Sequence, residues 1–409
     1  MHIAILAPSH KSFIYEFLPD IKSSELPEGI LSAPFIGTLI KEMLGMNHVV
    51  TAITLTKALN NDYGIKRFKS GNFEWIVVPY RPHSVRFNGR KIGRILDFYH
   101  FERFEMIKKI KEICPDIVHA HWSYEYAGAA LKCDYPYLIT IHDNAIKVLF
   151  FFKNIYRFGR LIMSELYLRK AKYVSTVSPY MLDYSTQRCL NTRIIPNPTK
   201  ISFDYEMIKS FIAKRSRSLA SARIIMINNG WDKRKNGKNA LLAFQILKKL
   251  MPNISLHLFG QGSEINGLAN KDALSIGLEN VNYYGIIPHD KLMKELVQTH
   301  LLLHTSLEES FGVILIEAMS LGIPAIGGIN SGAVPWVVND DKLLVDVENP
   351  AKIAEKMFDL LTNKSFYENI ALAGYSNVVN RFSSRKVAKE YLDYYEEILI
   401  NRECYVLNL

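Results

Sequence analysis

Short apolar runs alternate with amphipathic segments along the whole chain. Apolar runs that predict buried β-strands lie at residues 2–8, 49–55, 73–80, 116–122, 135–143, 171–178, 223–230, 254–262, 281–286, 300–306 and 323–328. Between them, residues 35–45, 100–114 and 238–251 have the apolar spacing of helices. Alternating strands and helices with near-continuous apolar strands are typical of parallel sheets covered on both faces, so we expect an α/β fold.

The length of the chain predicts two domains. With 409 residues, 48% of them hydrophobic, the chain can bury two cores. Prolines and an Asn interrupt the pattern at residues 193–200. We therefore predict two facing, doubly wound Rossmann-like domains, 1–198 and 199–380, with a cleft between them. Residues 381–409 are expected to be helical and to pack on either domain, crossing back to the first being one option.

In doubly wound sheets, ligands bind outside the carboxyl ends of the strands. The loops that follow the strands are therefore where we expect functional residues.

The net charge of +10 comes largely from two stretches. The basic residues of these stretches are Arg81, Arg86, Arg90, Lys91, Arg94, Arg103, Lys108, Lys109 and Lys111, then Lys147, Lys153, Arg157, Arg160, Arg169, Lys170 and Lys172. Surfaces of this kind attract nucleic acid, anionic lipid headgroups or nucleotides. A solvated helix face would account for them equally well.

Composition also predicts the compartment. The apolar run at 148–152 is too short to span a bilayer, and residues 1–11 indicate a buried strand and its turn rather than a signal peptide. The four cysteines, Cys114, Cys133, Cys189 and Cys404, show neither metal-ligand spacing nor a disulfide framework. We expect a cytoplasmic protein with free thiols.

Two glycine-containing loops of the second half follow predicted strands. The loop at 228–239 contains Lys233, Arg234 and Lys235, which can neutralise phosphate oxygens. It is neither a Walker A loop nor a GxGxxG loop, and an ordinary basic turn is the alternative. The loop at 259–264 contains Gly260, and a tight turn alone would explain it.

The segment 304–312, "HTSLEESFG", predicts a strand end followed by a helix that begins at Ser310. The N–H groups of a first helical turn can hold an anion, and Gly312 allows close backbone approach. Glu309 and Glu317 are eight residues apart, which places them on roughly the same face of such a helix. Two carboxylates beside an anion site suit a ligand with phosphate in the middle and hydroxyls at both ends. An ordinary helix start with favourable acidic residues is the alternative.

Two strand ends of the first half also carry candidate residues. His142 comes at the carboxyl end of the strand predicted at 135–143 and is expected to point into the cleft, although a single His is more often structural. His121 and Trp122 end the preceding strand, and we assign them to the acceptor side.

Several of these segments together resemble one family. "ESFGVILIEAMSLGIPAI" resembles the E-x7-E motif of the retaining nucleotide-sugar glycosyltransferases of family 4, also called glycosyl transferases group 1. "NNGWDKRKNGKNALLAF" resembles the phosphate loop of that family, and "GQGSE", "VNYYGIIPHDKL", "IIPNP", "AKYVSTVS" and "TIHD" resemble its other landmarks. The resemblance extends over nearly the whole chain and is strongest at 223–326. It implies the GT-B fold, two Rossmann-like domains with the donor bound mainly by the second.

The resemblance also implies roles for individual residues. Glu317 would bind the ribose hydroxyls, Glu309 the hydroxyls of the donor sugar, and His142 would lie beside the transferred sugar. Residues 285–288 would lie near the base. The remaining donor-binding residues, around the diphosphate, would be Gly230, Arg234, Lys235, Gly260, Ser310, Phe311, Gly312 and Val313. Of all these, Glu309, His142 and Lys235 would be catalytic.

Three positions depart from the pattern of the family. Asn229-Gly230 replaces its Gly-Arg pair, so Arg234 or Lys233 would have to supply the missing phosphate cation. Glu28-Gly29 replaces an N-terminal double glycine, and Trp336 stands where a Glu is usual.

The resemblance implies transfer of a sugar from a nucleoside diphosphate to an acceptor hydroxyl with retention of configuration. There is no Asp-x-Asp site, so we expect neither a metal nor another cofactor. The expected context is bacterial surface polysaccharide or glycolipid synthesis. The expected partners are a glycan or lipid-linked acceptor and, peripherally, the anionic inner face of the membrane.

Two alternatives differ in class. A nucleotide-sugar epimerase would convert the donor alone into its epimer. A basic nucleic-acid-binding protein would show tight, salt-sensitive binding to DNA or RNA, but no recognition module supports it, so we expect no nucleic acid partner.

Overall fold

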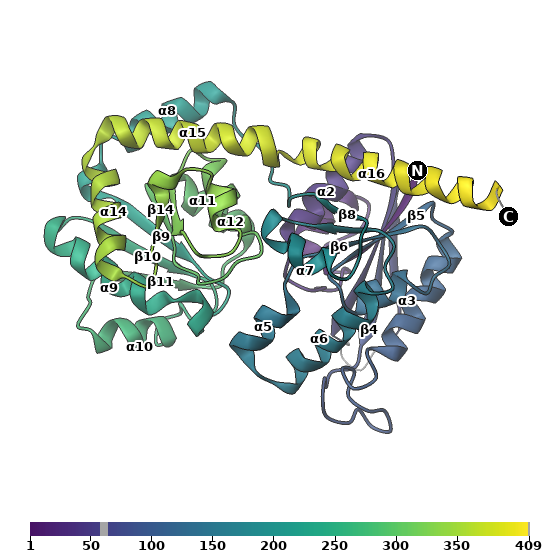
Figure 1. The fold of residues 1–409 in the computed structure, drawn as a ribbon. Helices are drawn as coiled ribbons and strands as arrows, with labels where there is room; N and C mark the ends of the chain where they lie inside the picture. Colours follow the sequence, from purple (N-terminus) through teal and green to yellow (C-terminus); the bar gives the residue numbers. More distant parts are fainter. Residues whose placement is uncertain (58–63, 408–409) are drawn as a thin grey trace. The chain divides into compact units, whose positions relative to one another are not determined.

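The structure is a computed structural model that describes residues 1–57 and 64–407, with side chains described to residue 401. The chain divides into two compact units (Figure 1). One contains Met1–Pro198 and Ser384–Leu409, and the other contains Thr199–Ser383. Each unit is built around one largely parallel sheet, which confirms the predicted pair of α/β domains.

The first unit contains an eight-stranded sheet in the order β3-β4-β2-β1-β5-β6-β7-β8. Its strands are β1 (His2–Leu6), β2 (Val49–Lys57), β3 (Lys66–Ser70), β4 (Phe73–Tyr80), β5 (Ile117–His121), β6 (Tyr137–Ile141), β7 (Val174–Thr176) and β8 (Thr192–Ile194). All neighbours are parallel except β3, which pairs with β4 in the antiparallel sense. Ile3 of β1 lies opposite Val50 on one side and Ile117 on the other, and all three form part of the strand layer of the sheet.

The helices of the first unit are α1 (Lys11–Ile14), α2 (Pro34–Gly45), α3 (His100–Ile113), α4 (Glu125–Ala130), α5 (Ala145–Phe152), α6 (Ile155–Leu168), α7 (Leu182–Thr186) and α16 (Ser384–Leu407). Helix α16, yellow in Figure 1, packs against α2 of this unit. Ser384 at its start donates to Glu42 over 2.6 Å, and its Tyr391 and Tyr395 are buried. The last helix therefore contributes aromatic side chains to the core of the first unit.

The second unit contains a six-stranded parallel sheet in the order β11-β10-β9-β12-β13-β14. Its strands are β9 (Arg223–Ile227), β10 (Ser255–Phe259), β11 (Val281–Gly285), β12 (Leu301–His304), β13 (Ala325–Gly328) and β14 (Leu344–Val345). Its helices are α8 (Tyr205–Arg215), α9 (Gly237–Leu250), α10 (Leu268–Ser275), α11 (His289–Val297), α12 (Val313–Met319), α13 (Val334–Val338), α14 (Pro350–Thr362) and α15 (Lys364–Phe382).

Each sheet reverses its strand order once. The order changes direction between β1 and β5 in the first unit and between β9 and β12 in the second. At such a switch point the loops of the two strands leave toward opposite faces and open a space at the carboxyl edge of the sheet. The loops after β5, β9 and β12 are therefore placed where a ligand can bind.

Not all of the basic residues lie on the surface. Arg81 is buried and makes ion pairs of 2.7 Å with Asp97 and with Glu102. Buried Arg103 donates to the carbonyl of Phe98, and the guanidinium of Arg160 lies 3.7 Å from the ring centre of Tyr124. The prediction of a basic surface was wrong for these three, because acidic or aromatic side chains lie against them, that of Arg103 being the ring of Tyr167.

Candidate functional site

A buried ion pair joins the loops that follow β9 and β12. The Nζ atom of Lys235 lies 2.5 Å from Oε1 of Glu309, and Lys235 is only 7% exposed. Asp232 caps the short turn that carries Lys235 by accepting from the N–H of Arg234. The carbonyl of Arg234 in turn accepts from the N–H of Leu307 over 2.7 Å, which ties the two loops together. Two of the predicted catalytic residues are thus in contact at the switch point.

Basic side chains surround the Glu309 carboxylate. Burial acts to raise its pKa, but Lys235, His304 and Arg234 outweigh burial and hold the pKa well below its usual value. Arg234 lies 4.0 Å from Glu309 and 3.8 Å from Glu308, and His304 lies 3.6 Å from Glu309. Glu309 is therefore ionised at neutral pH and holds cationic side chains in place.

The structure distinguishes the two basic residues that could replace the missing family Arg. Arg234 reaches Glu308 and Glu309, whereas Lys233 is exposed. Arg234 is therefore the one that accompanies Lys235.

Helix α12 begins later than predicted. It starts at Val313 rather than Ser310, because Gly312 precedes it in the left-handed conformation with φ of 85°. Glu309 consequently lies in the loop before the helix, where its carbonyl accepts from Ala333. The predicted start of the helix at Ser310 was wrong, whereas Glu317 lies within the helix as expected, and a shared face for Glu309 and Glu317 stays a prediction.

Glu317 has a separate partner. Its Oε1 lies 2.8 Å from Nε2 of His289, the first residue of α11. Burial acts to lower the pKa of His289, but the hydrogen bond and charge of Glu317 raise it above its usual value. Glu317 is itself only 9% exposed. The ribose-binding role of Glu317 stays a prediction.

The loop before α12 offers backbone donors. Among the described residues, no protein acceptor receives the N–H of Phe311 or of Gly312. The Phe311 ring is buried edge-on against Phe382 at 5.5 Å, so its side chain packs in the core. At Phe311 the backbone is the part that can contact a ligand. Ser310 and Val313 lie on either side of these two residues, at the end of the loop and the start of α12.

The glycine-rich turns after β9 and β10 approach each other closely. Gly230 and Gly260 have φ of 110° and 97°, values that favour glycine. A Cβ on Gly260 would lie 1.9 Å from the carbonyl oxygen of Asn228, so no larger residue fits there. These two predicted donor-site glycines therefore shape the loops.

Sequence reasoning missed a set of buried polar groups at the same strand ends. Asn228 is 2% exposed, yet in the described part of the chain neither atom of its side-chain amide has a hydrogen-bond partner. The hydroxyls of Ser263 and Ser306 are also buried without partners among those residues. Because unpaired buried polar groups are rare, they indicate ligand or water positions. The sequence signal that could have identified these residues is their position directly after predicted strands.

In the first unit, the three predicted residues at the ends of β5 and β6 are in contact. Nδ1 of His121 lies 2.9 Å from Nε2 of His142, and the two rings stack at 5.1 Å. The ring of Trp122 lies 4.4 Å from that of His142. Trp122 has φ of 69°, and so bulky a residue adopts this conformation only when its surroundings impose it. His121, Trp122 and His142 thus form one cluster.

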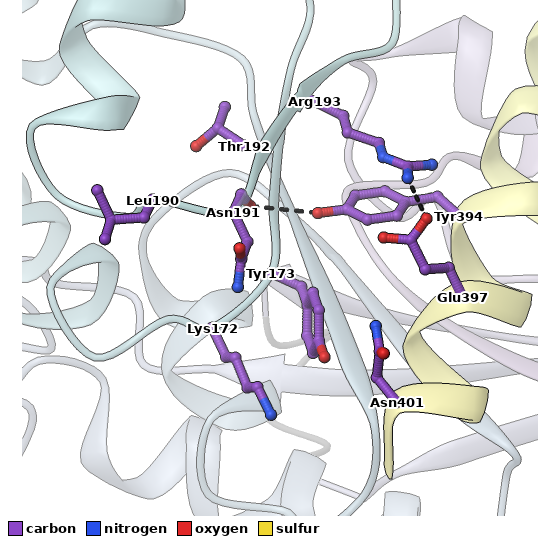
Figure 2. A pocket seen from close by; sticks show the side chains of 9 residues that line it. All are labelled: Lys172, Tyr173, Leu190, Asn191, Thr192, Arg193, Tyr394, Glu397 and Asn401. Atoms are coloured by element: carbon purple, nitrogen blue, oxygen red, sulfur yellow. Dashed lines mark hydrogen bonds and ion pairs between the residues drawn. The ribbon is translucent and has the colours of Figure 1, made fainter. Parts of the chain in front are cut away.

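A cavity of about 440 Å³ lies at the amino ends of strands β7 and β8 in the sheet of the first unit. Figure 2 shows Lys172, Tyr173, Asn191 and Arg193 around it, and these residues come just before or at the start of β7 and β8. Arg193 is already paired with Glu397 of α16. This cavity lies at the amino ends of the strands and is distinct from the clusters described above.

Other features of the described residues bear on the sequence predictions. Cys114, Cys133 and Cys189 are not in disulfides, and the side chain of Cys404 lies outside the described part. No helix within that part combines the length and apolarity needed to cross a bilayer. Across 1–57 and 64–401, no three metal-ligating side chains gather into a metal site.

Comparison with known proteins decides the family. Residues 210–377 match the family described as glycosyl transferases group 1, and residues 34–203 match that described as glycosyltransferase family 4. The chain belongs to the family 4, or group 1, glycosyltransferases. The predicted resemblance is confirmed, and it makes the chain a glycosyltransferase rather than an epimerase or a nucleic-acid-binding protein.

Two relatives that align over more than two thirds of this glycosyltransferase are distant in sequence. N-acetyl-alpha-D-glucosaminyl L-malate synthase of Bacillus anthracis is 24% identical and aligns over 69% of this chain and 75% of its own. One subunit of the phosphatidylinositol N-acetylglucosaminyltransferase of Arabidopsis thaliana is 21% identical over 78% of this chain and 69% of its own. The structure of sucrose-phosphate synthase from Thermosynechococcus elongatus superposes with a TM-score of 0.73 at 17% identity, covering 98% and 100% of the chains. That superposition confirms the GT-B fold of this glycosyltransferase.

Proposed function

We propose that this glycosyltransferase moves a sugar from a nucleoside diphosphate to an acceptor hydroxyl and retains the anomeric configuration. The observation that carries the proposal is the Lys235–Glu309 pair, with Arg234 beside it, at the switch point of the second unit. A diphosphate needs fixed positive charge, and a sugar needs carboxylate acceptors for its hydroxyls. This cluster offers both.

The second unit would stabilise the leaving group. Negative charge grows on the diphosphate as its bond to the sugar breaks, and preorganised donors that meet such charge lower the barrier. Lys235, Arg234 and the N–H groups of Phe311 and Gly312 are the donors available. Because these groups can neutralise the diphosphate, we propose that neither a metal ion nor another cofactor is required.

The bond changes balance without a further reactant. The bond from the anomeric carbon to the diphosphate oxygen breaks, and the acceptor oxygen bonds to that carbon on the same face. The acceptor proton passes to the departing phosphate oxygen. Glu309 would hold hydroxyls of the sugar, Glu317 those of the ribose, and His142 would lie beside the transferred sugar.

The names of these two relatives suggest which donor to test first. The Bacillus anthracis and Arabidopsis thaliana proteins are both named for N-acetylglucosaminyl transfer. We therefore propose a nucleoside diphosphate N-acetylhexosamine as the first donor to test. We propose a polysaccharide or lipid-linked acceptor, because helices α5 and α6 expose apolar and basic side chains suited to a membrane surface.

Helices α5 and α6 expose large apolar side chains beside cations. Ile146, Phe150, Ile155 and Phe158 are each at least 48% exposed. The interleaved cations Lys147, Lys153 and Arg157 are exposed or half-buried. Apolar residues among Lys and Arg favour the interface of an anionic bilayer. We propose peripheral binding to the cytoplasmic face of the membrane through these two helices, and we call the seven residues the α5–α6 surface.

A transfer assay with product analysis tests the function. The full chain is first screened by thermal shift against UDP, GDP and ADP sugars, N-acetylglucosamine donors included. The donor that stabilises it is then supplied with either a polyprenyl-diphosphate monosaccharide or a soluble glycoside. We expect an α-linked product from an α-donor by NMR, with or without EDTA. A β-linked product would overturn retention, activity that requires added Mg²⁺ would overturn metal independence, and an epimer of the donor would overturn transfer.

A further inference from the structure

Two neutral histidines at adjacent strand ends share one proton in a hydrogen bond. Burial lowers the pKa of His142 to about 3 and, with the neighbouring His119 and His142, lowers that of His121 well below its usual value. A neutral imidazole has one N–H donor and one bare nitrogen. Because Nδ1 of His121 and Nε2 of His142 are 2.9 Å apart, one of them must donate to the other. The tautomer of each ring therefore determines that of its partner.

The surroundings of His121 favour one direction. Its other nitrogen, Nε2, is buried and has no partner among the described residues. If His142 donated, the proton of His121 would have to be on Nε2, as a buried N–H without an acceptor, and such orphaned N–H groups are rare in proteins. If His121 donates from Nδ1, its buried Nε2 carries no proton, and the remaining N–H is that of the half-buried His142.

The ring of His121 packs against that of His119, which two hydrogen bonds hold in place. The ring of His119 lies 4.0 Å from that of His121. Both nitrogens of His119 are hydrogen-bonded, Nε2 to Thr140 over 2.7 Å and Nδ1 to Tyr395 of α16 over 2.5 Å. The ring of His121 therefore packs at a tilt of 38° against a side chain whose two ring nitrogens are both hydrogen-bonded.

The other nitrogen of His142 has no protein partner. Among the described residues, His142 makes one hydrogen bond, that to His121. Its half-buried ring packs between Trp122 and Phe35, whose ring centres lie 4.4 and 5.1 Å away. With Nε2 accepting from His121, the proton of His142 is on Nδ1.

We propose that His121 is a positioning residue, which donates from Nδ1 to Nε2 of His142 and thereby makes His142 present an Nδ1–H donor to a carbohydrate oxygen. Contact with the sugar rests on the proposed function, whereas the tautomer does not. His121 itself touches no substrate. The role predicted for it on the acceptor side is replaced by one exerted through His142.

Nitrogen NMR of the full chain labelled with [¹⁵N]histidine tests the tautomer directly. The signals of each ring are assigned by their loss in His121→Phe and His142→Gln. We expect both rings of the wild type to be Nδ1–H tautomers. In His121→Phe, we expect His142 to shift toward the Nε2–H form that free histidine prefers. An Nε2–H His142 in the wild type, or a tautomer unchanged in His121→Phe, overturns the proposal.

Kinetics separate positioning from a general structural role. An Asn at 121 carries an N–H donor close to the Nδ1 position, so His121→Asn should keep most of the activity. His121→Phe should lower kcat roughly 100-fold, because a misplaced catalytic group can cost that much, with little change in donor KM. His2→Phe is the matched control, since the His2 side chain, at the amino end of β1, makes one hydrogen bond among the described residues, to Thr51.

The two failures are distinguishable. If no sugar transfer is found for the wild type, the proposed function fails while the NMR result still decides the tautomer. If transfer occurs and His121→Asn and His121→Phe lose activity equally, with unchanged melting temperatures, the positioning role is overturned.

Discussion

Asn228 and Lys235 belong to one loop, but only the side chain of Lys235 has a protein partner for its polar atoms among the described residues. Lys235 is paired with Glu309, whereas neither side-chain atom of Asn228 has a partner within the described residues. A buried amide without partners costs stability, and a protein retains it when another molecule completes its hydrogen bonds. We infer that Asn228 binds the donor or a water that contacts it.

Replacing Asn228 tests this inference by two opposite effects. Asn228→Leu has a similar size and removes both unpaired atoms, whose burial costs about 1–3 kcal/mol, so the free protein should melt at a higher temperature. The same change should reduce the thermal shift produced by the nucleoside diphosphate that stabilises the wild type. Asn239→Leu, in the following helix, is the control. A lower melting temperature with an unchanged ligand shift contradicts the inference.

Helices α11 and α12 are joined by the contact of His289 with Glu317. Glu317 raises the pKa of His289 above its value in an unfolded chain, about 6.5. Protonation therefore favours the folded state, and this stabilisation is complete below about pH 6.5 and disappears as the pH rises past the folded pKa.

The difference in melting temperature between the wild type and His289→Gln measures this contact. We expect the wild type to be the more stable at pH 5.5–6 and the difference to shrink by pH 9. The effect should be modest, because the His289 side chain is 40% exposed. A difference that grows with pH would show that His289 is bound as the neutral ring.

Helices α5 and α6 carry the second prediction at this scale. Phe150→Asp with Phe158→Asp places negative charge in the α5–α6 surface. We expect this variant to lose co-sedimentation with vesicles that contain phosphatidylglycerol, and the wild type to lose it at high salt. Leu190→Asp, at a side chain 92% exposed elsewhere in the unit, should bind as the wild type does. Equal binding of the wild type to neutral phosphatidylcholine vesicles would refute an electrostatic contribution.

The sequence predicted elements better than contacts. Each predicted strand is present, because a short, near-continuous apolar run between helices of an α/β fold is buried most readily as a strand of the sheet. The start of α12 was misplaced because the left-handed Gly312 ends the preceding loop. The burial of Arg81 and the His121–His142 bond depend on partners 16 and 21 residues away. Spacing along the chain does not reveal such partners.

At the scale of the whole molecule, the two units have separate tasks in this account. The second unit would bind the nucleoside diphosphate at the ends of β9 and β12, and the first would contribute His142 at the end of β6. Substitutions in the second unit should therefore weaken nucleotide binding, whereas His142→Gln should reduce transfer and leave that binding intact.

Calorimetric titration with the nucleoside diphosphate selected by the thermal-shift screen tests the donor site most directly. Lys235→Ala and Lys233→Ala remove the same charge from the same turn, but only Lys235 is buried against Glu309. A hydrogen bond to a charged group contributes about 1.5–3 kcal/mol, so Lys235→Ala should weaken binding about 10- to 150-fold. Lys233→Ala should change it by less than about threefold, as expected for an exposed charge. Equal affinities of the two variants for the nucleotide would contradict the account.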